Sequence, residues 1–429
     1  MENKEINDIF DYANITDDCI KCGKCIPVCT IHRVNADEVT SPRGFLDLLG
    51  AYQRGNLELD ENVKSIFESC FLCTACVDVC PKSLPTDMVI EQVRSDIAKK
   101  YGIAWYKKAF FLLLRHRWMN DLAFKLGWTF QTCGFKIKAD IDSMSSRFNI
   151  PMLKTDRLLP SLRRKSFLNS HKENINNGGK RKVAIFIGCL GNYNYTDIGD
   201  GLLEILKALE IDAFLAKDQK CCSAPAYFTG DFDTVDSNAK HNIEYFESFG
   251  DDIEAIIVPE ATCSAMLKID YEHYFHDQPE WKARAIAIKD KIFMATEWLQ
   301  NHTHLEELLA SKKQIPKIVT YHDPCHARKM QGIHEEPRSL IRKNYNIVEM
   351  ADPNSCCGFG GVTMQSEKYH FAKAAGTPKA VMIKDTEADV VSAECSACRM
   401  QINASMNYAD VKTTFKNPIE LIADALREK

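Results

Sequence analysis

Two short stretches near the N-terminus decide how this chain is organised: Cys19-Ile20-Lys21-Cys22-Gly23-Lys24-Cys25-Ile26-Pro27-Val28-Cys29, and Cys70-Phe71-Leu72-Cys73-Thr74-Ala75-Cys76-Val77-Asp78-Val79-Cys80 followed by Pro81. Both have the spacing C-x2-C-x2-C-x3-C. Structural zinc sites usually take two separated cysteine pairs rather than four cysteines in one short run. A disulfide framework needs an oxidising compartment, and we see no sequence signal that directs export. The runs therefore indicate a different kind of metal centre.

This spacing is typical of a pair of [4Fe–4S] cubane clusters, in which three cysteines of one run bind one cluster and the fourth binds the other. The first cluster is accordingly assigned to Cys19, Cys22, Cys25 and Cys80. The second is assigned to Cys70, Cys73, Cys76 and Cys29. Residues 1–100 are expected to form a helical bis-[4Fe–4S] ferredoxin-like domain, hereafter the ferredoxin module. The chain is thus predicted to carry electrons.

Bulk composition narrows the class of protein. The 429 residues suggest two or three domains, and 45% hydrophobic with 26% charged residues is ordinary for globular chains. A net charge of −5 gives no general case for nucleic-acid binding. Met1–Phe10 is acidic and polar and does not resemble a signal peptide. No apolar run approaches the ~20 residues of a membrane span. The many cysteines therefore suggest the reducing cytoplasm.

Residues 101–180 differ from the module before them. Residues 101–150 interleave bulky aromatic side chains with cations: Trp105, Tyr106, Phe110, Phe111, Trp118, Phe124, Trp128 and Phe130 with Lys107, Lys108, Arg115, Arg117 and Lys125. Such an amphipathic stretch can pack on the core, bind a partner or lie in a membrane interface. Residues 151–180 are rich in polar and basic residues and are expected to be a solvated linker. Cys133 belongs to no motif and is expected to be buried.

Residues 181–429 contain an internal repeat, with an N-half (181–316) and a C-half (317–429). Each half begins with a buried-strand pattern, Lys182–Ile187 or Lys317–Tyr321, followed closely by a cysteine. Helical and strand-like segments then alternate, which predicts α/β units with parallel strands. Ligands in such units bind at the carboxyl ends of the strands. The cysteines that follow these strands should therefore converge.

The two halves do not carry the same thiols. The C-half has five, Cys325, Cys356, Cys357, Cys395 and Cys398. The N-half has four, Cys189, Cys221, Cys222 and Cys263, and Met266 stands where Cys398 is expected. Gly358, Gly360 and Gly361 after the C-half pair allow close backbone approach. For the N-half site the sequence leaves three possibilities: an ordinary iron–sulfur cluster, a zinc ion, or free thiols that pack in the core.

These residues resemble a known family. The repeat is similar to the cysteine-rich CCG domain of heterodisulfide reductase subunits, and the whole chain resembles the iron–sulfur subunit of glycolate oxidase. It is also similar to the iron–sulfur subunits of anaerobic glycerol-3-phosphate dehydrogenase and of lactate-oxidising complexes. The resemblance rests on the two cysteine runs, Ser41-Pro42-Arg43-Gly44, His322-Asp323-Pro324-Cys325-His326, Glu336-Pro337-Arg338 and Cys356-Cys357-Gly358. It implies an α+β multidomain chain, with the ferredoxin module followed by two pseudo-repeated α/β CCG half-domains.

The resemblance also implies cofactors and partners. A noncubane [4Fe–4S] cluster is expected on the five C-half cysteines. No flavin or nicotinamide motif is present, so a partner subunit with FAD is expected to oxidise glycolate, lactate or glycerol-3-phosphate. Electrons would pass to membrane quinone, from a cytoplasmic chain peripheral on the inner face of the membrane. The alternative is a heterodisulfide reductase-type subunit that reduces a disulfide at the C-half cluster.

Two histidines flank the first C-half cysteine. His322 and His326 can hydrogen-bond to cluster sulfurs or pass protons to a quinone. Histidines near metal centres more often support the ligands than act directly. We therefore expect a supporting role for both.

Overall fold

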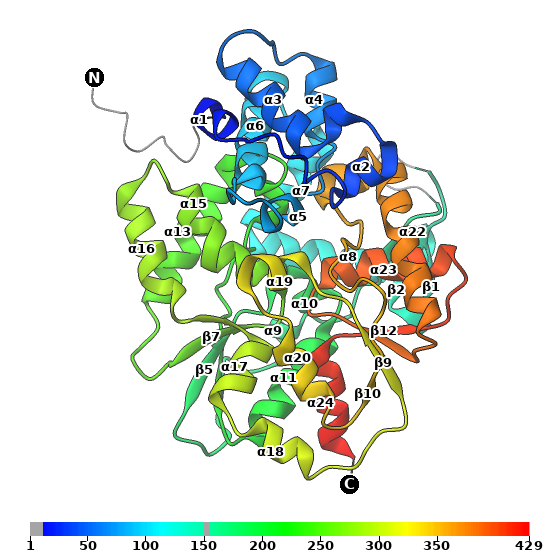
Figure 1. Ribbon diagram of the computed structural model, residues 1–429. Coiled ribbons are helices and arrows are strands. Elements are labelled where there is room, and N and C mark those ends of the chain that lie inside the picture. The colour runs from blue at the N-terminus through cyan, green and yellow to red at the C-terminus, as the bar shows by residue number, and fades with distance from the viewer. Residues whose placement is uncertain (1–11, 150–154, 429) are drawn as a thin grey trace.

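A helical N-terminal module stands against two α/β units in the computed structural model, which describes residues 12–149 and 155–428 (Figure 1). The expectation for Met1–Phe10 lies outside these residues. None of the described helices is long and apolar enough to cross a membrane. The order of helices and strands makes the fold mixed α/β, and helices dominate the N-terminal third of the chain.

The ferredoxin module is built from short helices around the two cysteine runs. Its helices are α1 (Tyr12–Asp17), α2 (Thr30–Asn35), α3 (Pro42–Gln53), α4 (Glu61–Phe67), α5 (Ala75–Asp78) and α6 (Thr86–Tyr101), with a 3-10 turn at Glu38–Thr40. Ser41 caps α3 by accepting a hydrogen bond from the Gly44 N–H, and Pro42 occupies the first turn. Phe45, Phe67 and Val89 are buried between α3, α4 and α6. This core fixes the loops that carry the cysteines.

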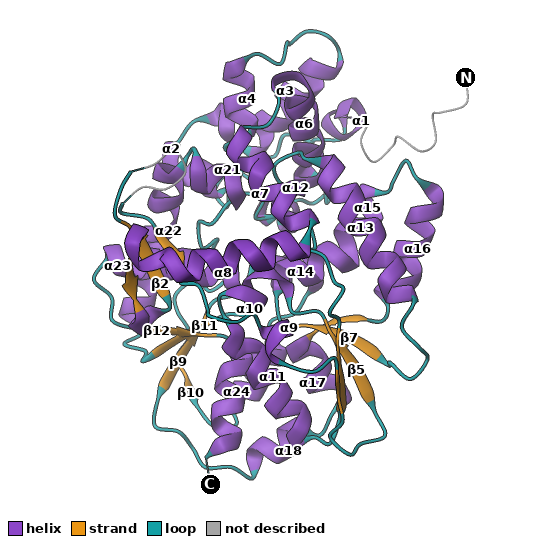
Figure 2. Cartoon of the chain, turned by 180° about the vertical axis from the view of Figure 1, so that it is seen from behind, coloured by secondary structure: helices purple, strands orange, loops and turns teal. Residues whose placement is uncertain are grey.

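Two long helices and a small sheet follow. They are α7 (Trp105–Arg115), α8 (Arg117–Gly134), β1 (Phe135–Lys138), the 3-10 turn Ala139–Ile141, β2 (Ser143–Ser146) and β3 (Leu158–Pro160). Lys107 is buried on α7 and pairs with Glu367 of the C-half at 2.7 Å. Figure 2 shows α8 crossing the back of the molecule. Cys133 is exposed near the end of α8, so the prediction of a buried thiol is wrong, because this last turn faces away from the core.

The N-half contains a five-stranded sheet in the order β4-β6-β5-β7-β8. Its strands are β4 (Asn174–Ile175), β5 (Lys182–Ile185), β6 (Asp212–Leu215), β7 (Ala255–Val258) and β8 (Ile292–Met294). The last four are parallel, and β4 pairs antiparallel with β6. The helices are α10 (Gly188–Tyr193), α11 (Thr196–Ala208), α12 (Ala224–Tyr227), α13 (Phe232–Glu247), α14 (Ala261–Ala265), a π-helical turn (Met266–Asp270), α15 (Tyr271–Tyr274), α16 (Pro279–Lys289), α17 (Ala295–His302) and α18 (Leu305–Ala310).

The C-half sheet repeats the order of the four parallel N-half strands. It runs β10-β9-β11-β12, all parallel, with β9 (Ile318–Tyr321), β10 (Asn346–Ile347), β11 (Val390–Ser392) and β12 (Thr414–Lys416). Its helices are α19 (Cys325–Gln331), α20 (Glu335–Ile341), α21 (Gly361–Ser366), α22 (Tyr369–Asp385), α23 (Ser396–Tyr408) and α24 (Pro418–Arg427). In both halves the first strand lies between the second and third. A cysteine follows the first and third strands in each.

The segment expected to be a solvated linker is partly folded. β3 extends the small sheet, and β4 adds an edge strand to the N-half sheet. In the helix α9 (Phe167–Ser170), Phe167 and Leu168 are buried in the core beneath α11. The prediction of a solvated connector is therefore wrong for this part, because two bulky apolar residues in a polar context are enough to anchor it.

Buried carboxylates join the two halves. Glu260 of the N-half accepts hydrogen bonds from the backbone N–H and hydroxyl of Ser396, in the first turn of α23. Glu394 of the C-half accepts from the backbone N–H and hydroxyl of Thr296 on α17. Burial raises the pKa of Glu260 to about 7 and that of Glu394 to about 8. These bonds hold the cysteine-bearing ends of the halves against each other.

Candidate metal centres

One cavity at the surface of the ferredoxin module is lined by Cys76 and by the four cysteines assigned to the first cluster, Cys19, Cys22, Cys25 and Cys80. These four come from the first run and from the end of the second. Cys22 is exposed, while the other three are partly covered. Apolar walls from Leu46, Leu84 and Pro81 close the rest of the cavity. Four thiols around an apolar cavity suit a [4Fe–4S] cluster, and these are the residues assigned to the first cluster from the sequence.

A second cavity gathers Cys29 with Cys70, Cys73 and Cys76. Phe45 and Phe71 line it as well. Burial raises the pKa of Cys29 to about 11 and that of Cys70 to about 12, because an apolar cavity disfavours a bare thiolate. A bound cationic centre supplies the charge that stabilises thiolates. The residues therefore fit the second predicted cluster, although that assignment stays a prediction.

Secondary structure brings the C-half thiols together at one end of the sheet. Cys325 begins α19 after β9, the Cys356-Cys357 pair lies on the loop before α21, and Cys395 precedes α23. Cys398, in the first turn of α23, lies 3.3 Å from Cys357 between sulfur atoms. The N–H of Cys398 also donates to the Cys395 sulfur at 3.5 Å.

Two C-half thiols, Cys357 and Cys395, have pKa values below the ordinary thiol value. The pKa of Cys357 is lowered to about 5, because hydrogen bonds from Cys356 and Cys398 stabilise its thiolate. Cys325 and Cys395 also lie close enough to act on this pKa, in the opposite direction. All five cysteines thus surround one buried site, in agreement with the convergence expected from the strand pattern. Five converging thiols fit an iron–sulfur centre.

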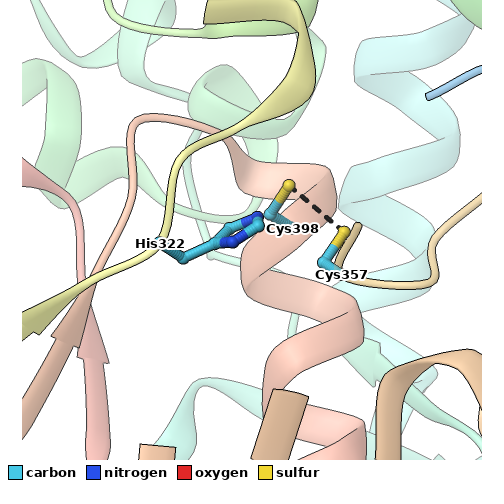
Figure 3. A group of neighbouring side chains, drawn as sticks. All are labelled: His322, Cys357 and Cys398. Carbon is cyan, nitrogen blue, oxygen red and sulfur yellow. Dashed lines mark hydrogen bonds between the residues drawn. The ribbon is translucent and has the colours of Figure 1, made fainter. Parts of the chain in front are cut away.

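Figure 3 shows a histidine beside two of these thiols. A ring nitrogen of His322 and the sulfur atoms of Cys357 and Cys398 lie within 4.8 Å of one another. All three residues are buried. Within residues 12–149 and 155–428 this is the one group of three such donors that close together.

The C-half site touches the second ferredoxin cavity. The thiols of Cys73 and Cys356 lie close enough for each to shift the pKa of the other. Gly360, two residues after Gly358, has a positive φ of 65°, and a Cβ there would lie 2.8 Å from the Phe71 ring. Only glycine allows this approach of the two loops. The two cysteine sites are therefore direct neighbours.

The N-half thiols form a looser arrangement. Cys189 is hydrogen-bonded to Cys221, which neighbours Cys222 in the chain, and Cys222 lies 3.3 Å from Cys263 between sulfur atoms. Met266, at the position that matches Cys398, is fully buried. Among the described residues no three N-half thiols lie as close as the His322 group. The arrangement is a row of paired thiols.

Two of the motifs that carry the family resemblance meet at the C-half site. Arg338 donates to Asp323 at 2.6 Å and to Glu349 at 2.7 Å. Arg328 also pairs with Asp323, whose carboxylate is completely buried. Because Asp323 stands two residues before Cys325, this network fixes the start of α19. It therefore positions the first C-half thiol.

Sequence reasoning missed two buried cations near the sites. Arg94 donates to the carbonyl groups of Phe67, Cys70 and Phe228, and so ties the ferredoxin module to the N-half. Lys379 donates to the Asp352 carbonyl at 2.7 Å, and burial lowers its pKa to about 8. Both lie in ordinary helical sequence on α6 and α22. No local pattern marks them, because their role arises only when the modules pack.

Comparison with known proteins agrees with this architecture. The model of the 4Fe-4S dicluster domain matches residues 15–84, and the model of the CCG cysteine-rich domain matches 183–268 and 319–403. A probable glycolate oxidase iron-sulfur subunit of Bacillus subtilis is 29% identical over 90% of this chain and 87% of its own. Lactate utilization protein A of Bacillus velezensis is 30% identical over 53% of this chain and 93% of its own. An uncharacterized iron-sulfur protein of Methanococcus maripaludis is 28% identical over 90% of this chain and 67% of its own.

Among solved structures, glutamate racemase from Francisella tularensis has a TM-score of 0.23 and 13% identity over 58% of this chain and 79% of its own, a likeness too weak to bear on function. The sequence matches carry the assignment instead, because they cover the cysteine runs and both half-repeats. The chain belongs to the family of these iron–sulfur subunits and lactate utilization proteins, with a 4Fe-4S dicluster domain followed by two CCG cysteine-rich domains.

Proposed function

We propose that this chain is the electron-transfer subunit of a flavin-dependent dehydrogenase complex. A partner subunit with FAD oxidises a 2-hydroxy acid such as glycolate or lactate, or glycerol-3-phosphate, and electrons leave toward membrane quinone. The names of the relatives support the substrate class, since they include glycolate oxidase and lactate utilization proteins. Iron–sulfur clusters suit this task because they exchange single electrons with flavins and quinones.

One observation carries the proposal: the three cysteine sites form an unbroken series. Cys76, Pro42 and Thr86 line both ferredoxin cavities, so the first adjoins the second. The second meets the C-half site through Cys73 and Cys356. In the proposed complex Cys19, Cys22, Cys25 and Cys80 hold the first cluster, Cys29, Cys70, Cys73 and Cys76 the second, and the five C-half cysteines the third. The N-half thiols lie outside this series.

The exposed end of the series suits electron entry. Cys22 is exposed at the first cavity, with Lys21, Lys24 and Lys82 around it on the surface. An acidic face on the flavoprotein would complement this basic rim and bring FAD near the first cluster. Cations also favour the reduced, more negative state of a nearby cluster. The first cluster is therefore the proposed electron acceptor.

Anaerobic purification of the native complex tests this function. Addition of the hydroxy acid or glycerol-3-phosphate should reduce the clusters, seen as loss of visible absorbance and gain of electron paramagnetic resonance (EPR) signals, only when the flavoprotein is present. A Lys21→Glu, Lys24→Glu variant should slow this reduction, whereas Lys412→Glu, on a distant exposed loop, should not. Disulfide reduction by the isolated chain at a comparable rate, without any flavoprotein, contradicts the proposal and favours the heterodisulfide reductase-type alternative.

The same proposal places the chain on the inner membrane surface through an apolar stripe on α8. Trp118, Leu122, Leu126 and Phe130 recur every four residues on one face of this helix, and each side chain is at least half exposed. Trp105 of α7 is 76% exposed. These exposed side chains favour a partner or a membrane over packing on the core, the three possibilities that the sequence left open.

Charge decides which partner the stripe suits. Lys108 and Lys125 are exposed beside the stripe. Asp121 is the one acidic residue of α7 and α8, and its carboxylate accepts a hydrogen bond from the Tyr193 hydroxyl at 2.7 Å. An apolar helical face flanked by cations is typical of segments that lie in the interface of an anionic membrane. We therefore assign the stripe to anionic lipid rather than to a protein partner.

Vesicle flotation of the purified complex tests the lipid assignment. Binding to phosphatidylglycerol vesicles should exceed binding to phosphatidylcholine vesicles, and should fall at least tenfold in Leu122→Glu, Leu126→Glu. Val381→Glu changes an exposed apolar residue on α22 and should leave binding unchanged. Equal flotation of all variants, or none with anionic lipid, contradicts the assignment.

A further inference from the structure

The imidazole of His322 is the feature of the C-half site that the thiol count does not explain. The residue follows β9 directly and is 1% exposed. Figure 3 shows its ring lying next to Cys398 and near Cys357, with the three side chains coming from separate segments. Metal donors bound to one tetrahedral ion, at bond lengths of about 2.3 Å to sulfur and 2.0 Å to nitrogen, lie roughly 3.5 Å apart. The His322 nitrogen and the two sulfur atoms lie within 4.8 Å of one another, and the two sulfur atoms are 3.3 Å apart.

Hydrogen bonding fixes which ring nitrogen is available. His322 Nδ1 lies 3.1 Å from the carbonyl oxygen of Pro353. A carbonyl oxygen only accepts, so Nδ1 carries the proton and Nε2 keeps its lone pair in the neutral ring. Nε2 is buried and has no hydrogen-bond partner in the described part of the chain. Metal-bound histidines commonly donate their other ring N–H to a backbone carbonyl in this way.

The N-half supplies an independent observation. Counting back from the first cysteine of each half, His322 corresponds to Phe186, and the fifth thiol, Cys398, corresponds to Met266. Both replacements are fully buried. The half that lacks the fifth thiol thus also lacks the histidine. Among the donors that differ between the halves, His322 and Cys398 are the two that lie together beside Cys357.

We propose that His322 Nε2 binds directly to an iron atom of the C-half centre, beside Cys357 and Cys398. The inference rests on the proposed function, because it requires iron at this site. It differs from the supporting role expected from sequence, because the imidazole adds a neutral nitrogen donor to the five thiols. An iron bound by a neutral nitrogen instead of a charged thiolate raises the reduction potential of a cluster, as the histidine ligands of Rieske centres illustrate.

Pulsed EPR of the reduced holoprotein tests the ligand. The C-half centre should show a strongly coupled nitrogen, stronger than the weak couplings of backbone amides, that changes when histidine is labelled with 15N. His322→Ala should remove this coupling. His326→Gln is the matched control, because His326 lies 3.3 Å from the Cys325 sulfur but belongs to no close donor group. It should leave the coupling unchanged.

The outcomes separate this inference from the proposed function. Iron present at the C-half site without a strongly coupled histidine nitrogen overturns the inference and leaves the electron-transfer proposal intact. A C-half site without iron overturns both. His322→Cys guards against misfolding of the alanine variant, since a thiolate can take the same position. It should keep the iron content, lose the nitrogen coupling and lower the reduction potential of the centre.

Discussion

The two halves share the order of their four parallel strands and the positions of four cysteines, and the proposed electron route continues into the C-half. The C-half centre has five thiols and His322, and it touches the second ferredoxin cavity through Cys73. The N-half has four thiols, with Phe186 and Met266 buried in the remaining positions. The same fold thus brings six potential metal donors together in the C-half and only four thiols, with apolar side chains in the matching positions, in the N-half.

The halves also position their first cysteine differently. Asp323 precedes Cys325 by two residues and is held by Arg338, whereas Ile187 takes the matching position before Cys189 and packs in the core. The same parallel-sheet fold is therefore compatible with an ion pair or with apolar packing at this position. Ion pairs are more directional than apolar contacts. The first cysteine is therefore held more precisely in the C-half, which is the half proposed to bind a cluster.

The largest effect is expected when Cys398 of the C-half is replaced by methionine, the residue at the matching N-half position, Met266. Cys398→Met should remove about four iron atoms per chain, because the fifth thiolate is lost, and should abolish electron transfer to a quinone analogue. Met266→Leu, the matched change in the N-half, should leave the iron content as it is. Iron and acid-labile sulfide analysis checks both variants. An unchanged iron content in Cys398→Met would contradict the claim that the fifth thiol distinguishes the C-half site from the N-half site.

A smaller effect is expected from the ion-pair network. Arg338→Met leaves the buried Asp323 with Arg328 alone and should lower the free energy of unfolding by about 3 kcal/mol. In the N-half, Ile187→Val should cost about 1 kcal/mol. Denaturant unfolding under anaerobic conditions measures both. Equal costs would show that the two halves hold their first cysteine with similar strength.

The smallest effect concerns the residue after each cysteine pair. Gly358 has a φ of 89°, and a Cβ there would lie 2.8 Å from the Gly376 nitrogen of α22. Gly358→Ala should therefore cost about 1–2 kcal/mol from the left-handed backbone alone, and more from the clash with α22. Ser223 already adopts a φ of 74° in the N-half, so Ser223→Gly should change stability by less than about 1 kcal/mol. Thermal unfolding compares the pair, and a neutral Gly358→Ala would contradict the role of this contact.

Much of this organisation could be predicted from the sequence. Cysteine spacing predicted which residues share a cavity, because a tight loop keeps its thiols together whatever surrounds it. Strand patterns predicted β5 and β9 within a few residues, since buried parallel strands appear in sequence as short apolar runs. The glycines after Cys357 were expected to allow close approach, and Gly358 and Gly360 do so against α22 and Phe71.

Packing between distant segments could not be predicted. The contact of Cys73 with Cys356 depends on how the ferredoxin module sits on the C-half, which no local pattern encodes. The orientation of α8 likewise decides that Trp118 and Phe130 face outward and that Cys133 is exposed. His322 was correctly noticed as a flanking residue, but its closeness to Cys398 arises only from the folded sheet.

The central claim is that the C-half centre continues the route from the second ferredoxin cluster, and EPR of the fully reduced holoprotein tests it most directly. The contact between Cys73 and Cys356 predicts magnetic coupling between these two centres, seen as broadened or split signals. Cys398→Met should remove that coupling and restore the simpler signals of the ferredoxin clusters. A spectrum of the intact protein that equals the sum of separate, uncoupled centres would contradict the account.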